Sequence, residues 1–200
     1  MSKRPGSNKE NLEETRRTFL DVAIKEFCEH GFAQASTSRI VERSGMARGS
    51  LYYHFGDKNG LFHDVYEDIM SKCIVGVSAK MDVFDDAWDA FMAGTDAFLD
   101  LCLQKEFRKI ILIESQGAMT YEQRIAVQQK TLLAKLHNLL PDLFARGYFP
   151  GHNAQTFSVL VYGVLGETGR ALDFSENIEE DRKIFGQAFK ETMKCLRTSP

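Results

Sequence analysis

Apolar residues recur at helical spacing along nearly the whole chain of 200 residues. Phe19, Val22, Ala23 and Phe27 lie three or four positions apart, a spacing that puts side chains on one face of a helix. No pair of partner strands is visible, so the sequence predicts an all-α fold of about nine helices. The expected helices span residues 12–30, 37–44, 47–54, 58–79, 84–104, 106–114, 121–140, 153–174 and 178–196.

Cap and turn residues separate the predicted helices near the N-terminus. Gly31 supplies a C-terminal stop, Gly45 permits a sharp turn, and Ser36 and Asp57 are favourable N-cap residues. Residues 1–11 are polar and mildly basic, and we expect a flexible arm there.

Two later stretches allow more than one interpretation. The apolar run at 110–113 could form a strand, but without a visible partner strand we favour a short buried helix. Residues 115–120 predict a break. The helix over 121–140 is expected to end near Pro141, with residues 143–147 either extending it or forming a short turn.

Residues 37–54 have the length and the glycine-containing turn of a helix-turn-helix. In that motif the N-terminal residues of the second helix lead into the major groove, so they must be small or polar. Arg48 can donate two hydrogen bonds to the O6 and N7 atoms of a guanine. Gly49 permits close approach, and Ser50 can donate or accept a hydrogen bond.

The aromatic segment that follows divides between two faces of the same helix. Leu51 and Phe55 are four residues apart and should face the core. Tyr52, Tyr53 and His54 point elsewhere, where their rings can pack along the sugar-phosphate backbone and their polar tips can bond phosphate oxygens.

Lys58 would add a positive charge at the start of the next helix, whose N-terminal amides favour an anion. Taken singly these signals are weak, because adjacent tyrosines in a helical protein are more often packing residues. The ordered combination of a cap, a glycine turn, a small polar lead and Leu-Tyr-Tyr-His-Phe favours a DNA reader.

Charge is unevenly distributed along the chain. The formal net charge is −3, but residues 1–60 hold ten Lys and Arg against eight Asp and Glu, and the remainder holds 15 against 20. This distribution fits a small basic module joined to an acidic body that should not bind nucleic acid.

The sequence offers little support for an enzyme or a metal site. The four cysteines lack metal-ligand spacing, and we expect reduced core cysteines, with a redox sensor at Cys102 as the sharper alternative. No nucleophile elbow, phosphate loop, zinc-protease or dinucleotide motif occurs, so we expect no catalytic residue, no metal and no cofactor. Without a signal peptide or an apolar run long enough to cross a bilayer, the sequence predicts a cytoplasmic protein.

Three segments within residues 13–65 carry a family resemblance. They are HGF at 30–32, STSRIVERSGMARGSLYYHF at 36–55 and DKNGLF at 57–62. In these segments the chain resembles the TetR family of bacterial transcriptional regulators. The resemblance implies a homodimeric repressor that binds a palindromic double-stranded DNA operator and leaves it when a small-molecule effector binds. A DNA-binding domain would span residues 12–58, and a ligand-binding and dimerisation domain residues 59–200.

By position, the resemblance also implies a role for each residue of the predicted DNA surface. Thr37 would contact the DNA backbone; Arg48, Gly49, Ser50 and Tyr52 would lie at or beside base edges; and Tyr53, His54 and Lys58 would hold phosphates. Val41, Ser44 and Gly60 depart from the family pattern, and Gly60 is expected to loosen the helix that connects the two domains.

The second domain has the material for a ligand pocket, since such sites are largely apolar with a few placed polar groups. The candidates are Trp88, Phe91, Gln116, Tyr121 and Tyr162, with Glu114, Glu167 and Arg170 as further polar groups. Ordinary core packing is the stronger alternative for most of these rings. Gln116 and Tyr121 stand out because they flank the break at Gly117.

Gly163, Gly166 and Gly169 interrupt an otherwise apolar helix, where each glycine costs about 1 kcal/mol relative to alanine. Close approach of another helix would compensate, and we interpret this helix and residues 180–196 as a two-fold dimer interface. The interface candidates are Gly163, Gly166, Arg170, Phe185 and Phe189. A monomer with a tightly packed central helix is the alternative. For the whole chain, a helical small-molecule-binding protein or enzyme without operator binding remains the alternative function.

Overall fold

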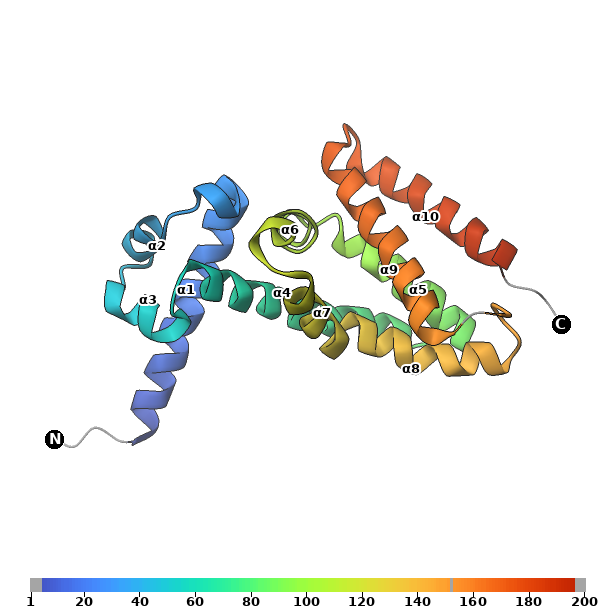
Figure 1. Ribbon diagram of the computed structural model, residues 1–200, viewed down its shortest axis with the longest axis horizontal. Helices are drawn as coiled ribbons and strands as arrows, with labels where there is room; N and C mark the ends of the chain where they lie inside the picture. The colour runs from blue at the N-terminus through green and yellow to red at the C-terminus, as the bar shows by residue number, and fades with distance from the viewer. Residues whose placement is uncertain (1–4, 152, 197–200) are drawn as a thin grey trace.

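The computed structural model describes residues 5–151 and 153–196, and over these residues the chain is helical without a strand (Figure 1). The predicted all-α fold is confirmed, with ten α-helices in the described part of the chain. These are α1 (Pro5–Gln34), α2 (Thr37–Ser44), α3 (Arg48–Phe55), α4 (Lys58–Met81), α5 (Ala87–Leu101), α6 (Ser115–Ala118), α7 (Tyr121–Lys130), α8 (Leu132–Ala145), α9 (Ala154–Ala171) and α10 (Ile178–Leu196). A π-helix, η1 (Phe107–Glu114), precedes α6, and a short 3₁₀ turn, η2 (Leu172–Phe174), follows α9.

Helices α1 to α3 form a head at one end of the molecule; α4 joins it to the other helices, and α1 also contacts η1 and α6 (Figure 1). Helix α1 begins at Pro5, so most of the predicted arm over residues 1–11 is helical; residues 1–4 lie outside the described residues. The predicted stop at Gly31 is present as a break in the helix, with φ of 69° and ψ of 165°. One further turn follows the break.

The two short helices of the head begin and end where their cap residues predict. The Ser36 side chain accepts a hydrogen bond from the Arg39 amide at the start of α2, and Gly45 ends α2 in the left-handed conformation. Ala47 precedes α3, and Asp57 caps α4 by accepting a hydrogen bond from the Gly60 amide.

Gly60 has a packing role that the sequence does not reveal. A Cβ atom at this position would lie 2.0 Å from the carbonyl oxygen of Phe55 at the end of α3. Only glycine therefore lets α4 start so close to α3. Gly60, which departs from the family pattern, thus allows a close contact between the end of α3 and the start of α4.

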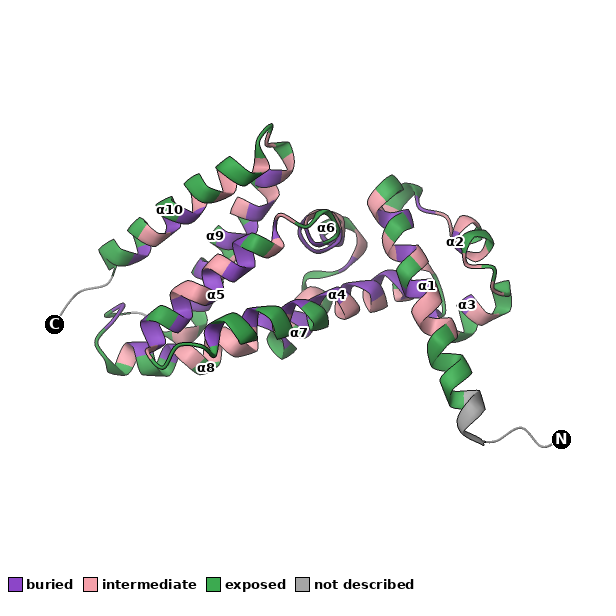
Figure 2. Cartoon of the chain, turned by 180° about the vertical axis from the view of Figure 1, so that it is seen from behind, coloured by how far each residue is buried: buried purple, intermediate pink, exposed green. Residues whose placement is uncertain are grey.

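Helix α4 connects the head to the C-terminal domain (α5 to α10), called the sensor domain after the ligand-binding role that the sequence analysis expects, and one hydrophobic core runs through both. Its first turns pack under the head, where Phe62 makes edge-to-face contacts with Phe27 and Phe32. Its later turns pack against α5, and Met81 lies against Gly94 of that helix. The buried side of α4 faces the protein along its whole length (Figure 2).

Three segments of the sensor domain differ from the sequence prediction. Residues 107–114 are helical as predicted but form a π-helix, and part of the predicted break at 115–120 is the short helix α6. The predicted helix over 121–140 is interrupted at Thr131, whose hydroxyl donates to the Val127 carbonyl and so competes with helical bonding. Helix α8 continues through Pro141 to Ala145, so the helix extends past the proline, which is one of the two alternatives given for residues 143–147.

Candidate nucleic-acid interface and ligand cavity

Helix α3 divides into a buried and an exposed face as its sequence predicts. Leu51 is fully buried and Phe55 is 7% exposed, so both pack into the head. Arg48 and Gly49 are exposed at the start of the helix, and no atom lies within 4 Å of the Cβ position at Gly49. The first turn of α3 therefore offers an open surface to a partner.

Tyr52 joins α2 and α3 into one polar surface. Arg48 Nη2 lies 3.4 Å from the Tyr52 hydroxyl, and the guanidinium lies 5.6 Å from the centre of the tyrosine ring. Hydrogen bonds from Thr37 and then from Arg48 lower the pKa of Tyr52. Three residues predicted to contact DNA from two different helices are thus adjacent on the exposed side.

The remaining predicted contacts of α3 differ in exposure. Tyr53 is 75% exposed, whereas Ser50 and His54 are partly buried. The His54 ring lies between its neighbours, 5.3 Å from the Tyr53 ring centre and 5.8 Å from that of Phe55. Tyr53 is the most accessible aromatic group on this helix.

Lys58 has a different role from the predicted phosphate contact. Its ammonium donates to the carbonyl oxygens of Phe32 at 2.8 Å and of Ala33 and Ala35 at 3.2 Å each. It also lies 4.6 Å from the centre of the Phe32 ring. Because an ammonium has three protons, these three acceptors leave none for a phosphate. Lys58 therefore ties the end of α1 to α4.

A buried carboxylate that the sequence analysis missed holds α2 against α1. Glu26 is fully buried and accepts hydrogen bonds from the Ser36 amide at 2.9 Å and from Arg39 Nε at 2.7 Å. Burial raises the pKa of Glu26, but the bonds from Arg39 and Ser36 outweigh it and leave the pKa below its ordinary value. Arg43 lies 3.4 Å from the same carboxylate. The available signal was the pair of arginines spaced four apart on α2.

A cavity of about 540 Å³ lies in the sensor domain between η1, α6, α7, α8 and α9. Three of the predicted ligand residues, Gln116, Tyr121 and Tyr162, lie on its wall. Apolar side chains also line it; they are Ile111, Leu112, Ile125, Leu133 and Val159. The volume falls within the range of small-molecule sites, and the wall has the expected mixture of apolar and polar groups.

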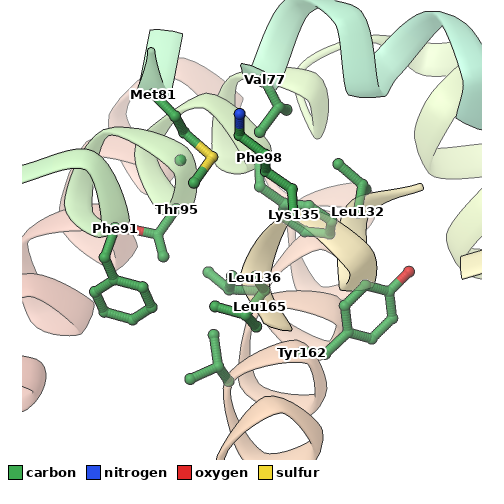
Figure 3. Close-up of a pocket in the computed structure, with 12 residues that line it drawn as sticks. Val77, Met81, Phe91, Thr95, Phe98, Leu132, Lys135, Leu136, Tyr162 and Leu165 are labelled. Carbon is green, nitrogen blue, oxygen red and sulfur yellow. The ribbon is translucent and has the colours of Figure 1, made fainter. Parts of the chain in front are cut away.

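The other two predicted ligand residues lie elsewhere. Phe91 borders a separate space of only about 50 Å³, drawn in Figure 3, which is too small for an organic ligand. Tyr162 borders both spaces, with its hydroxyl directed away from Phe91 (Figure 3). Trp88 lines neither and packs among the rings of Phe91, Tyr148 and Phe149, so the core-packing alternative is correct for it.

The cavity wall also contains residues that the sequence analysis missed or assigned to the dimer. Arg124, Gln128 and His137 were missed, because the sequences of α7 and α8 resemble ordinary solvated helix surfaces. Gly163, Gly166 and Arg170, predicted at the dimer interface, lie on the cavity wall. Of the further polar candidates, Glu167 is exposed and pairs with Arg170.

The two residues of α10 predicted at the dimer interface differ in how far they are buried within their own chain. Phe189 is only 6% exposed and packs into the core of its own chain, and Phe185 is partly buried. Gly169 is also used within the chain, since a Cβ there would lie 2.7 Å from Cys102 Sγ. The large apolar side chains that remain exposed on α9, η2 and α10 are Val159, Leu160, Val164, Phe174, Ile184 and Leu196.

Two polar contacts connect the cavity walls to the head and its supporting helix. Gln128, on the cavity wall, donates to the Tyr66 hydroxyl of α4 at 3.0 Å. Glu114, at the end of η1, accepts a hydrogen bond from the Phe32 amide of α1 at 2.7 Å. This second bond lies directly after the break at Gly31, so Glu114 holds the turn that leads into α2.

Three of the four cysteines are buried or partly buried as the sequence predicts, whereas Cys195 is exposed. Cys102 is fully buried and Cys73 is 6% exposed, and burial raises the pKa of each thiol to about 12. Burial likewise raises the pKa of Cys28 to about 11. Protonated, inaccessible thiols are poor nucleophiles, so the core explanation holds for Cys102. In the described residues, no helix is both long and apolar enough to cross a membrane.

Comparison with known proteins assigns both parts of the chain. Residues 19–65 match the family of bacterial regulatory proteins of the tetR family, and residues 88–196 match the tetracyclin repressor-like C-terminal domain. The HTH-type transcriptional regulator AcrR of Shigella flexneri is 39% identical over 59 residues. That match covers 30% of this chain and only 27% of AcrR, so it compares the heads alone.

Solved structures share the whole fold. A TetR-family regulator from Pectobacterium atrosepticum superposes with a TM-score of 0.77 at 27% identity, covering 96% of this chain and 98% of its own. The regulator FadR from Bacillus subtilis, solved in complex with stearoyl-CoA, gives a TM-score of 0.74 at 16% identity, covering 92% and 98%. With a helix-turn-helix head, a helical sensor domain and family matches over both, this chain belongs to the TetR family of bacterial transcriptional regulators.

Proposed function

We propose that this protein is a ligand-responsive repressor that binds a palindromic operator as a homodimer and leaves it when a small molecule fills the large cavity. One observation carries the proposal. An exposed polar surface on α2 and α3 and a ligand-sized cavity in the sensor domain are joined through a single continuous helix, α4.

The DNA-contacting surface in this proposal is the one around Tyr52. Arg48 and Ser50 read base edges, Thr37 and Tyr53 contact the backbone, and Gly49 keeps the helix close to the groove. His54 contributes a phosphate contact from the side of α3. Lys58 is left out of this surface because its ammonium is bound to the end of α1.

Release follows from the two contacts that cross between the parts of the molecule. A ligand that displaces Gln128 changes the support of Tyr66 on α4. A ligand that displaces η1 moves Glu114 and with it the Phe32 amide at the turn into α2. Either movement reorients the head, which lowers the affinity for an operator that fits only one spacing of two heads.

The exposed apolar side chains of α9 and α10 support the homodimer. Leu160 and Val164 are each at least half exposed, as is Ile184 on the neighbouring helix. Exposed apolar patches of this kind mark interaction sites, and in a two-fold dimer the same patch serves both subunits. Two heads about 34–36 Å apart would then reach adjacent major grooves on one side of the duplex.

The test is fluorescence anisotropy with a labelled duplex taken from the region upstream of the protein's own gene, in excess unrelated DNA. We expect saturable binding that survives the competitor, and Arg48→Ala should lose preference at one base pair of each half-site, by about 1–3 kcal/mol. Full retention of preference by Arg48→Ala would remove that residue from the proposed readout. Ligand binding without any operator found by selection from random duplexes would favour the alternative of a small-molecule-binding protein.

A further inference from the structure

The wall of the large cavity is lined by basic side chains and by no acidic one. Its charged or titratable residues include Arg124, Arg170 and His137, and no Asp or Glu lines it. This is unusual for a sensor domain whose sequence is acidic overall. A site of this character favours a negatively charged ligand, because a buried anion requires a positive partner or several donors.

The two arginines differ in how far they are already paired. Arg170 binds Glu167, one helical turn away on α9, through Nε and Nη2. Arg124 makes no ion pair with any residue that the structure describes. Its Nη1 donates to the carbonyl oxygens of Ser115 at 3.1 Å and Met119 at 2.7 Å, at the junction of α6 and α7.

These two bonds hold one arm of the Arg124 guanidinium and leave the other edge free. Within the described chain, neither Nε nor Nη2 of Arg124 has a hydrogen-bond partner. A guanidinium fixed in this way presents two parallel N–H groups, which match the two oxygens of a carboxylate. The glutamine amides on the wall, Gln116 among them, add neutral donors that suit the same group.

The rest of the wall indicates the body of the ligand. Leu133, Ile125 and Val159 line the cavity together with the rings of Tyr121 and Tyr162. These side chains suit an apolar chain or an aromatic ring, and the volume of about 540 Å³ accommodates a molecule much larger than a simple inorganic anion.

We propose that the effector is an organic carboxylate with an apolar body, whose charged end is held by Arg124. The proposal rests on the proposed function, since it names the class of ligand for that cavity. The proposal specifies that the effector carries a negative charge and that Arg124 binds this charge.

The test uses isothermal titration calorimetry on the full chain with matched probes: decanoate, tetradecanoate, benzoate and 2-naphthoate, each against its uncharged primary amide. We expect at least one carboxylate to bind at least about tenfold more tightly than its amide. Arg124→Gln should weaken that carboxylate by about 10- to 100-fold, the worth of hydrogen bonds to a charged group, and leave the amide unchanged. Lys130→Gln removes a positive charge from the exposed side of the same helix and should change neither affinity.

Arg124→Lys keeps the charge but not the paired N–H groups, and its carboxylate affinity should lie between those of the wild type and Arg124→Gln. It replaces Arg124→Gln if that variant melts below the assay temperature, because Arg124 also holds the α6–α7 junction. Amides that bind as tightly as their acids, a carboxylate affinity unaffected at Arg124, or no binding by any carboxylate at 1 mM would overturn the proposal. Operator binding without ligand is measured separately. Failure of carboxylates to bind therefore leaves the proposed repressor function untouched, and failure to bind an operator leaves the carboxylate site untouched.

Discussion

At the scale of single residues, the structure gives two residues contacts that differ from those the sequence analysis expected. Glycine in the interior of a helix is normally a weak point, yet Gly60 faces the Phe55 carbonyl at a distance that excludes any side chain. We expect Gly60→Ala to lower the free energy of unfolding by about 1–3 kcal/mol, the usual cost of overpacking, despite the higher helix propensity of alanine. Urea denaturation measures this change.

Gly76 is the matched control on the same helix. It is exposed, and no atom lies within 4 Å of its Cβ position. Gly76→Ala should stabilise the protein by up to about 1 kcal/mol, since only helix propensity changes. Equal effects of the two substitutions would mean that the contact between Gly60 and Phe55 does not govern the start of α4.

Lys58 is the second of these residues, and its bonds to carbonyl oxygens can be distinguished experimentally from a phosphate contact. Lys58→Met keeps the apolar stem beside the Phe32 ring and removes the three hydrogen bonds to α1 carbonyls. We expect a loss of about 2 kcal/mol in unfolding free energy, the worth of hydrogen bonds to one charged group. The dependence of operator affinity on salt should stay the same. A salt slope lowered by about one, with unchanged stability, would instead identify Lys58 as a phosphate contact.

At the scale of elements, the carboxylate between α1 and α2 makes the stability of the head depend on pH. The pKa of Glu26 is lower in the folded protein than in the unfolded chain, so below its ordinary value of 4.5 the unfolded state binds a proton first. The contribution of Glu26 is therefore full above about pH 4.5 and is lost as the pH falls through the lower folded pKa. Glu26→Gln should be less stable at neutral pH and should lose less stability than the wild type as the pH falls from about 5 to about 3. Parallel pH profiles for the two proteins would contradict this role.

The contact between Glu114 and Phe32 is the element-scale link between sensor and head. In Glu114→Gln the amide oxygen can still accept the Phe32 N–H bond, whereas Glu114→Ala leaves that amide without its partner. We expect hydrogen exchange at the Phe32 amide to accelerate in Glu114→Ala and to stay slow in Glu114→Gln. Slow exchange in both variants would show that the turn after Gly31 is held by other contacts.

The elements that the sequence predicts well are those with local signals. The start of α2 is fixed by the Ser36 cap, its end by Gly45, and the start of α4 by the Asp57 cap. Because these bonds are local, the sequence predicts the short helices of the head almost to the residue. The helix break at Thr131 contains no glycine or proline from which it could be predicted. Arg124 and Gln128 look like the polar face of a solvated helix, and only the position of α7 across the cavity from α9 and η1 makes that face a cavity wall. Side-chain partners such as Glu26 and Glu114 depend on tertiary contacts, which the order of residues along the chain does not specify.

At the scale of the whole molecule, the proposed homodimer would recognise its operator through the spacing of two heads, and we expect the exposed apolar side chains of α9 and α10 to form the interface. Val164 is 50% exposed and Ile184 is 57% exposed, which leaves much apolar area in contact with water in a single chain. Burying such a patch against its symmetry copy is favourable at about 25 cal/mol per Å², whereas a carboxylate there would have to be buried without a partner.

We expect light scattering to give twice the chain mass of 22.7 kDa for the wild type and a single chain mass for Val164→Glu. Val75→Glu, at a 70% exposed valine on α4, should remain dimeric. A single head can contact only one half of a palindrome, so Val164→Glu should also bind the operator much more weakly. Its thermal unfolding should still show a folded protein. A dimeric Val164→Glu with full operator affinity would place the interface on another face.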